Sequence, residues 1–307
     1  MKILLLGANG QLGQTFMSEG GLAKRGELVA ASRDGQVPSG ARGVVGDLAD
    51  LVGLEAMLDR ECPQIIVNAA AYTAVDKAES DEATAMQVNG HAPGLLGQWA
   101  ARHDALVVHY STDYVFPGDA SIPYPPQAST GPQGAYGRSK LAGEQALRAS
   151  GAAHLILRTA WVYSTVGHNF LKTMLRLGAE REELSVVADQ RGTPTTTTII
   201  VAGSLAAIDA QQASAKASAL SGTYHLTASG ETTWHGFAEA IFDEAVRVGV
   251  LARRPIVHAI GTEQFPTPAR RPAYSVLDNT SFTETFGHVL PGWRDGLSET
   301  MNTLHAS

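Results

Sequence analysis

The sequence predicts an α/β fold in which a doubly wound parallel sheet is joined to a smaller, interleaved α/β domain. In the first half of the chain, short apolar runs alternate with helical patterns. Such alternation is typical of a parallel sheet with helices on both faces. After about Thr159 the rhythm changes, which indicates a second structural unit. A chain of 307 residues, 44% of them hydrophobic, is long enough for about two domains.

The predicted strands of the first half are nearly continuous in apolar residues. Helices cover both faces of such strands, because neither face carries the polar residues that would meet solvent. The five runs are Lys2–Leu6, Glu27–Ala31, Gln64–Asn68, Ala105–Tyr110 and Ala153–Arg158. Helices are predicted between them at Leu12–Glu19, Leu51–Arg60, Asn89–His103 and from Tyr136 onward.

The second half mixes strands and helices less regularly. Strands are predicted at Glu183–Ala188 and Gly222–Thr227, and helices at Phe170–Leu177, Thr198–Ala210 and Phe237–Val248. Prolines predict a loop at Phe265–Pro272. We assign residues 1–158, with returns near 194–222 and 256–278, to the first domain, and residues 159–193, 223–255 and 279–307 to the second.

Charge and composition exclude several classes of function. Acidic residues outnumber basic ones by 30 to 23, so no nucleic-acid partner is expected, because such a partner needs a basic surface. No apolar stretch is long enough to span a membrane, and the single cysteine, Cys62, fits a reducing cytosol. We therefore expect a cytoplasmic protein without a membrane partner. The ten histidines show no spacing typical of ligands, so no metal site is predicted.

A glycine-rich turn joins the first strand to the first helix. It reads Gly7-Ala8-Asn9-Gly10-Gln11-Leu12-Gly13. Glycines in such a turn allow a sharp change of direction, close approach to a pyrophosphate and close packing of helix on strand. The helix N-terminus offers N–H groups and a positive dipole end to the phosphates. The turn predicts a Rossmann-type dinucleotide-binding domain, with a plain tight turn as the alternative.

The end of the second strand indicates which dinucleotide binds. An acidic residue there usually holds the ribose 2′-hydroxyl, whereas arginine accommodates a 2′-phosphate. This chain has Ser32-Arg33, followed by Asp34. The pattern favours NADPH. NADH is the alternative if Arg33 is only a solvated loop residue.

Tyr136 and Lys140 stand four residues apart at the start of a predicted helix, so their side chains share a face. A carbonyl that receives hydride develops negative charge on oxygen and needs a proton donor. We expect Tyr136 to donate this proton, and Lys140 to lower the pKa of the phenol and to hold the cofactor ribose. Thr112, just after the predicted strand Ala105–Tyr110, would bind the same carbonyl oxygen. The alternative is an ordinary surface helix end.

Taken together, these residues resemble the extended short-chain dehydrogenase/reductase superfamily and, within it, the dTDP-4-dehydrorhamnose reductase family. The similarity extends over nearly the whole chain. Its most specific strings are Ala74-Val75-Asp76-Lys77-Ala78-Glu79 and Ser111-Thr112-Asp113-Tyr114-Val115-Phe116. Other matching stretches are Gly10–Gly13, Val67–Ala71, Tyr136–Glu144, Arg158–Tyr163, Asn169-Phe170, Asp189-Gln190 and Arg271-Pro272.

The resemblance implies an NAD(P)H-dependent reductase whose substrate is a dTDP-linked 4-keto-6-deoxy sugar, dTDP-4-dehydro-L-rhamnose. It implies a proton donor at Tyr136, a lysine at Lys140 and a supporting threonine at Thr112. The implied cofactor contacts are Gly10, Gln11, Leu12, Asp47, Leu48, Ala71, Tyr72, Thr73 and Tyr110. Sugar contacts are implied at Thr112, Asp113 and Trp161, and we expect Arg271 at the substrate diphosphate.

This chain departs from the family pattern in two places. Members often carry an acid where Ser32 stands, so the departure supports NADPH. Some members form a homodimer through a metal held by carboxylates, one of them on the first helix. Gln14 and Thr15 stand there in this chain, so that metal is not expected, while a homodimer stays open.

Two other functions also stay open on the sequence alone. A sugar-nucleotide dehydratase or epimerase of the same superfamily is the first. Dehydratases usually carry an Asp-Glu pair after the threonine, and here Asp113 is followed by Tyr114. A non-catalytic regulatory subunit with a dinucleotide pocket is the second, against which the presence of Tyr136, Lys140 and Thr112 argues.

Overall fold

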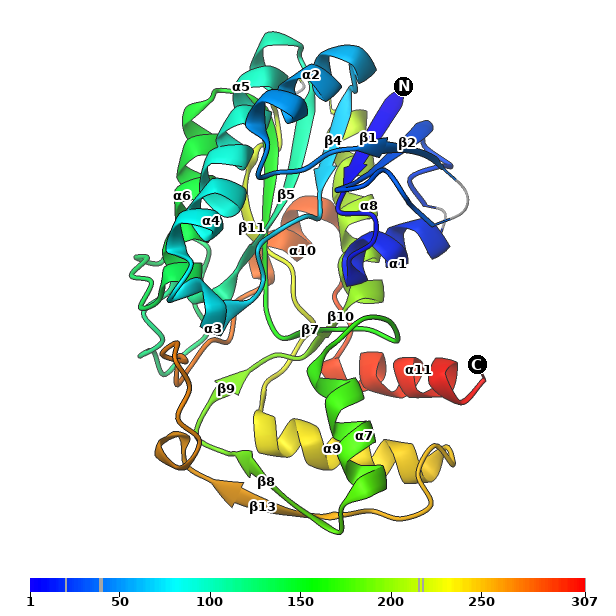
Figure 1. The fold of residues 1–307 in the computed structure, drawn as a ribbon, viewed down its shortest axis with the longest axis vertical. Helices are drawn as coiled ribbons and strands as arrows, with labels where there is room; N and C mark the ends of the chain where they lie inside the picture. The colour runs from blue at the N-terminus through cyan, green and yellow to red at the C-terminus, as the bar shows by residue number, and fades with distance from the viewer. Residues whose placement is uncertain (20, 39–40, 215, 217, 307) are drawn as a thin grey trace.

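A computed structural model describes residues 1–19, 21–38, 41–214, 216 and 218–306. Its main element is a seven-stranded sheet in the order β11-β6-β5-β4-β1-β2-β3, with every neighbouring pair parallel (Figure 1). The chain starts near the middle of this sheet and builds it outward in both directions, so the predicted doubly wound sheet is confirmed. The strands are β1 Lys2–Leu6, β2 Glu27–Ser32, β3 Arg42–Val45, β4 Ile65–Asn68, β5 Leu106–Thr112, β6 Ala153–Thr159 and β11 Gly222–His225.

Helices cover both faces of this sheet, which explains the continuous apolar runs of its central strands. One face packs against α1 Gln11–Glu19, α8 Thr197–Ala213 and α10 Thr280–Phe286. The other face packs against α2 Leu51–Glu61, α5 Ala92–Arg102 and α6 Ala135–Ala149, with the short helices α3 Val75–Ala78 and α4 Glu82–Met86 against α6. None of the helices in the described ranges is long and apolar enough to cross a membrane.

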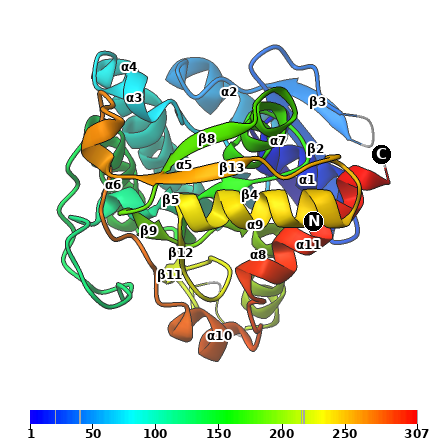
Figure 2. The same cartoon turned by 90° about the horizontal axis from the view of Figure 1, so that it is seen from below.

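A smaller unit lies beyond the carboxyl ends of the large-sheet strands (Figure 1). Its parallel pair, β8 Glu183–Val187 and β13 Ile256–Ile260, lies beside α7 Phe170–Glu180 and α9 Trp234–Arg247 (Figure 2). Helix α11, Trp293–His305, packs on α9. Two-residue strands complete it and pair as β7 Val162–Tyr163 with β10 Thr195–Thr196, and as β9 Arg191–Gly192 with β12 Thr232–Thr233.

Three details of the predicted domain boundaries are wrong. The boundary at residue 223 falls inside β11, which extends the large sheet beside β6. Residues 256–260 pair with β8 instead of returning to the large sheet. Helix α10, assigned to the second domain, packs on α8 and β11. Each error has the same cause. The local sequence of a short strand or helix does not indicate which element it will pack against, because that element is distant in the sequence.

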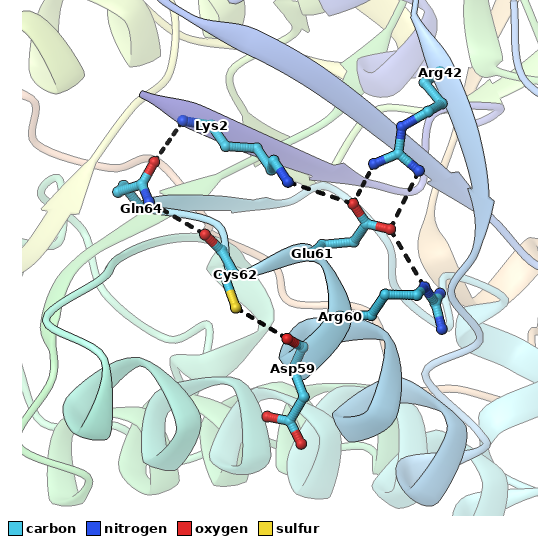
Figure 3. A network of polar contacts seen from close by, with 7 residues as sticks. All are labelled: Lys2, Arg42, Asp59, Arg60, Glu61, Cys62 and Gln64. Carbon is cyan, nitrogen blue, oxygen red and sulfur yellow. Dashed lines mark hydrogen bonds and ion pairs between the residues drawn. The ribbon is translucent and has the colours of Figure 1, made fainter.

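A buried carboxylate fastens the edge of the large sheet to α2. Glu61, at the end of α2, is only 3% exposed and accepts hydrogen bonds from Arg42 of β3 (Figure 3). Lys2 of β1 and Arg60 lie 3.7 Å and 3.4 Å from its oxygens. The hydrogen bond with Arg42 is the main reason that the pKa of Glu61 lies below its ordinary value. The carboxylate thus links β1, β3 and α2, which lie apart in the sequence.

We expect Glu61→Gln to lower the free energy of unfolding at pH 7 by about 1–2 kcal/mol, because the buried carboxylate no longer pairs with the cations of Lys2, Arg42 and Arg60. A depressed folded-state pKa stabilises the protein above the unfolded-state value and is lost as the pH falls through the folded-state value. The deficit, measured by urea unfolding, should therefore shrink below about pH 4. Glu55→Gln, on the same helix but in an exposed pair with Arg102, is the control and should change much less. Equal effects of both substitutions would contradict this account.

Candidate active site

The glycine-rich turn lies where β1 meets α1, and its first and last glycines are required sterically. Gly7 has a φ of +78°, and a Cβ there would lie 2.7 Å from the Ala70 nitrogen. A Cβ on Gly13 would lie 2.1 Å from the Gly7 carbonyl oxygen. A Cβ on Gly10 would meet only that same oxygen within 4 Å, at 3.3 Å. The turn is therefore closed toward the protein and open at Gly10, with the first N–H groups of α1 beside it, which fits a pyrophosphate.

At the end of β2, the carboxylate of Asp34 is bonded within the protein, whereas the guanidinium of Arg33 is exposed. Ser32 is buried, and its hydroxyl donates to Asp34 at 2.8 Å. This bond, followed by one from the Gln36 backbone, lowers the pKa of Asp34, whose carboxylate is thus used within its own turn. Arg33 is exposed and forms no ion pair within the part of the chain that the structure describes. Its guanidinium is therefore available to an anionic group at this strand end.

Asp47 and Leu48 follow β3, next to the end of β2. The Gly46 nitrogen donates to the Ser32 carbonyl oxygen at 2.8 Å, so Asp47 comes directly after a residue bonded to β2. Its carboxylate accepts from the Ala49 nitrogen at 2.9 Å, and Leu48 is buried in the core beneath. The two residues therefore line the same strand ends as Ser32 and Arg33.

Gln11, at the start of α1, connects the turn to the smaller unit. Its side-chain oxygen accepts hydrogen bonds from Ser164 at 2.9 Å and from Asn169 at 2.8 Å. Leu12 packs against the core. The Gln11 side chain is thus engaged within the protein, and its backbone N–H at the helix N-terminus is the group that faces the open side of the turn.

Asn89, which the sequence reasoning did not single out, holds the loop Ala71-Tyr72-Thr73. Its side-chain oxygen accepts from the Tyr72 nitrogen at 2.9 Å, and its amide donates to the Tyr72 carbonyl at 3.0 Å. The same amide contacts Ser139 of α6 at 3.1 Å. The Tyr72 hydroxyl donates to Asp81 at 3.1 Å, so the backbone of this loop, with the small Ala71, is the part left to face a ligand.

The helix predicted at Asn89–His103 is in fact two segments. A π-helical turn, Gln87–His91, precedes α5, and Pro93 stands in the first turn of α5. Proline has no N–H to give to the Asn89 carbonyl, and a Cβ on Gly143 of α6 would lie 2.0 Å from that oxygen. Pro93 was the signal for this break in the sequence, because a proline removes a hydrogen bond from a helix. A π turn next to it often marks a functional site.

Tyr136 lies in the first turn of α6, whose N-terminus is capped by Glu79 from the loop after α3. The Glu79 carboxylate accepts from the Ala135 nitrogen at 2.8 Å. The ring of Tyr136 is half-buried and meets the ring of Tyr114 edge to face, with centroids 5.7 Å apart. Its hydroxyl lies within hydrogen-bonding reach of Thr112. The structure thus brings Tyr136 and Thr112 together.

The expected lowering of the Tyr136 pKa by Lys140 is wrong for this state of the protein. Burial is the main cause of a pKa well above the ordinary value of 10, and the charge of Asp113 adds to it. A hydrogen bond with Thr112 acts in the opposite direction but is weaker. The phenol therefore keeps its proton at neutral pH.

Lys140 is buried one turn further along α6, and its nitrogen donates to the Tyr110 carbonyl oxygen at 2.6 Å. Burial lowers the Lys140 pKa to about 8, opposed by the charge of Glu144. The Tyr110 ring points the other way, and its hydroxyl donates to Ser204 of α8 at 2.7 Å. The Tyr110 side chain therefore belongs to the core and its carbonyl holds Lys140, while the implied cofactor contact at Tyr110 stays a prediction.

Asp113 lies beside this pair and is 2% exposed. One carboxylate oxygen accepts from the Thr112 hydroxyl at 2.8 Å. The other is buried without a hydrogen-bond partner among the described residues. Burial raises the Asp113 pKa to about 6, although Ser275 and Thr112 lower it in part. A buried carboxylate with a free acceptor is suited to a hydroxyl-bearing ligand.

Trp161 lies two residues beyond β6, whose Thr159 pairs with Thr112. Its φ of +46° is unusual for a bulky residue and aims the indole toward the smaller unit. There it stacks on Trp234 of α9, with ring centroids 3.5 Å apart, and a Cβ on Gly192 would lie 2.4 Å from it. The indole is thus held by Trp234 and by the backbone of Gly192.

Arg271 lies in the proline-rich loop and bridges two of the recognised motifs. It donates to Asp76 of α3 at 2.6 Å and to the Tyr114 hydroxyl at 3.0 Å. Asp76 also accepts from the Ala269 nitrogen at 3.1 Å. The string Ala74–Glu79 therefore has two structural tasks: Asp76 fixes the loop that carries Arg271, and Glu79 caps α6.

Metal ligands are not gathered at the site. Gln14 donates to the Asn9 carbonyl at 2.8 Å, and Thr15 donates to Thr197 at 2.7 Å. Over the ranges that the structure describes, no three His, Cys, Asp or Glu side chains lie together as a metal-binding group.

Comparison with known proteins agrees with this geometry. The profile of the RmlD substrate binding domain family matches residues 1–306. The chain belongs to the dTDP-4-dehydrorhamnose reductase family. The dTDP-4-dehydrorhamnose reductase of Burkholderia thailandensis is 46% identical over 297 residues, which are 96% of each chain.

Solved structures give the same result. The dTDP-4-dehydrorhamnose reductase of Clostridium acetobutylicum superposes with a TM-score of 0.87 at 35% identity, over 99% of both chains. The enzyme of Bacillus anthracis, determined in complex with NADP, superposes with a TM-score of 0.85 at 32% identity, over 98% of this chain and 99% of that one. The Rossmann-type fold is therefore confirmed.

Asp113 should destabilise the fold at neutral pH. Because its folded-state pKa of about 6 lies above the ordinary 3.8, stability is lost as the pH rises through this interval. We expect Asp113→Asn to raise the free energy of unfolding by about 1–3 kcal/mol at pH 8 and by little at pH 4, as measured by urea unfolding. Asp104→Asn, at an exposed position, is the matched control. An Asp113→Asn protein that is no more stable than wild type at pH 8 would show that the buried charge of Asp113 does not destabilise the fold.

Proposed function

We propose that this protein reduces the C4 keto group of dTDP-4-dehydro-L-rhamnose with NADPH and so forms dTDP-L-rhamnose. The observation that carries the proposal is the position of the Tyr136 phenol near Thr112 and Asp113, at the carboxyl edge of a sheet whose glycine turn fits a dinucleotide. Ligands bind at this edge in open α/β sheets. The relatives named above are reductases of this keto sugar.

The cofactor supplies a hydride when it is bound. We assign its pyrophosphate to the turn Gly7–Gly13, and its adenosine to the strand ends that carry Ser32, Arg33, Asp47 and Leu48. Arg33 would meet the 2′-phosphate, because its guanidinium is exposed while Asp34 is held by Ser32. Ala71, Tyr72 and Thr73 would face the cofactor with their backbone, and Lys140 would hold ribose hydroxyls.

Tyr136 would give its proton to the oxygen that becomes the alkoxide at C4. A donor must be protonated before it acts, and the raised pKa of Tyr136 meets this condition. Thr112 would fix the same oxygen, and the free carboxylate oxygen of Asp113 would accept a sugar hydroxyl. These groups act only if the keto sugar lies between them and the nicotinamide.

The smaller unit would bind the rest of the substrate. Trp161 is stacked on Trp234 and also lies against Gly192, so only the part of the indole that these two residues leave open would meet the sugar. Arg271 uses two of its five N–H groups on Asp76 and Tyr114 and would offer others to the diphosphate. A homodimer and a cytoplasmic location stay predictions of the sequence.

Tyr136→Phe should lower kcat for NADPH oxidation with the keto sugar by about 10²–10⁴-fold, because only the proton donor is lost. Circular dichroism and NADPH affinity should be unchanged. Tyr224→Phe, which removes a remote hydroxyl bonded to the Leu220 carbonyl, is the control and should keep full activity. If Tyr136→Phe turned over at the wild-type rate, another group would be the donor.

Arg33→Ala should raise KM for NADPH by about 10–100-fold and leave KM for NADH nearly unchanged, because only NADPH carries the 2′-phosphate. The measurement is initial-rate kinetics with each coenzyme. Arg102→Ala, which removes an exposed arginine paired with Glu55, controls for the loss of positive charge. A parallel change for both coenzymes would contradict the assignment of Arg33.

A further inference from the structure

Lys140 ends a line of buried polar side chains whose other members, Asn68 and His109, have no role in the proposed reaction. Asn68 ends β4, His109 lies on β5 and Lys140 on α6, and these elements are neighbours in the fold (Figure 1). The three side chains are 1%, 1% and 2% exposed. Buried polar groups of this kind are held by hydrogen bonds, so their directions can be followed from one residue to the next.

The direction of the first hydrogen bond fixes the position of the proton on His109. The Asn68 side-chain oxygen accepts from the Ala70 nitrogen at 3.3 Å, so its amide nitrogen faces Nδ1 of His109, at 3.1 Å. An amide nitrogen can only donate, and Nδ1 therefore accepts. Burial, and then the charge of Lys140, hold the pKa of His109 well below 6.5, so the ring is neutral. A neutral ring whose Nδ1 accepts carries its proton on Nε2.

That Nε2 lies 3.4 Å from the nitrogen of Lys140. We propose that His109 is a positioning residue for Lys140: Asn68 holds its ring in the Nε2–H tautomer, and this N–H is directed at the lysine nitrogen. The proposal rests on the proposed function only for what Lys140 does with the cofactor. The tautomer and the contact are properties of this chain alone.

The consequence concerns the charge on Lys140. An N–H aimed at an ammonium is a contact between two donors, whereas the same N–H aimed at an uncharged amine is a hydrogen bond. His109 therefore acts with burial to favour the amine. The opposing groups are the Tyr110 carbonyl and Glu144 of α6, whose carboxylate also binds Arg158 at 2.7 Å and Arg148 at 3.1 Å. A lysine so placed exchanges its proton closer to neutral pH than an ordinary lysine does.

The network also reaches the cofactor side of the site. Ala70, whose nitrogen donates to Asn68, is the residue against which Gly7 is packed. Asn68 thus connects the glycine turn with the group that sets the state of Lys140. A substitution of Asn68 would therefore affect both the glycine turn and Lys140.

The tautomer can be measured directly on the intact protein without its cofactor. Long-range ¹H–¹⁵N NMR distinguishes a bare from a protonated ring nitrogen, and the His109 signals are identified by their loss in His109→Asn. We expect a bare Nδ1 and a protonated Nε2 from pH 6 to pH 9. A bare Nε2, or a ring that titrates in this range, would overturn the proposal whatever Lys140 does.

Variants test whether His109 acts through Lys140. His109→Asn keeps a partner for Asn68 but withdraws the N–H from the lysine, so the Lys140 pKa should rise. NADPH binding, measured by fluorescence, should weaken at high pH as Lys140 loses its proton. In the variant the midpoint of this loss should lie at least about half a pH unit higher, so that at pH 9 it binds NADPH about threefold more tightly than wild type. The control is His154→Asn, on the neighbouring strand β6, and it should change nothing.

A double-mutant cycle separates positioning from a merely structural role. In a Lys140→Met background, His109→Asn should no longer alter the pH profile. If its effect were the same with and without Lys140, His109 would act on packing and the proposal would be wrong. If Lys140→Met itself bound NADPH like wild type at every pH, the proposed role of Lys140 would fail, while the NMR result would still decide the tautomer.

Discussion

The position of the Tyr136 phenol depends on how the N-terminus of α6 is held. Glu79 accepts from the Ala135 nitrogen at 2.8 Å, and a Cβ on Gly137 would lie 2.3 Å from the Tyr114 carbonyl oxygen. The first turn of α6 is therefore packed on the backbone that follows Thr112 and Asp113. Because these contacts are short and specific, the phenol, the threonine hydroxyl and the carboxylate are placed by backbone and not by flexible side chains alone.

The same site concentrates features that do not favour folding. Asp113 is buried with an unpartnered oxygen, Lys140 is buried as a cation, and Trp161 has a positive φ. Each costs stability that the rest of the structure must offset. That three such features lie together at the carboxyl edge of the sheet agrees with a role in binding and catalysis.

Local sequence was sufficient for the features that local physics decides. The strand Lys2–Leu6 and the turn at Gly7–Gly13 were predictable, because apolar runs and glycine spacing are short-range signals. The helix that carries Tyr136 and Lys140 was predictable for the same reason. The edge strand Arg42–Val45 was not, since it is mostly exposed and has no buried face to produce a pattern.

The partners of individual side chains required the fold. Nothing near Arg271 in the sequence indicates that it binds Asp76, because 195 residues separate them. The Tyr110 ring points to α8 because strand residues alternate between the faces of the sheet, and the register decides which face it meets. Asn89 and His109 were missed because each acts only through groups on other elements.

The most direct measurement is the ionisation of Tyr136 itself. Tyrosinate absorbs in the near ultraviolet, so the difference between the pH titrations of wild type and Tyr136→Phe isolates this phenol. If burial and Asp113 keep Tyr136 protonated, the difference spectrum will show no tyrosinate at any pH below 10, the ordinary pKa of tyrosine. A tyrosinate signal at neutral pH, absent from Tyr136→Phe, would mean that the phenol is ionised before it can donate, and the account would be wrong.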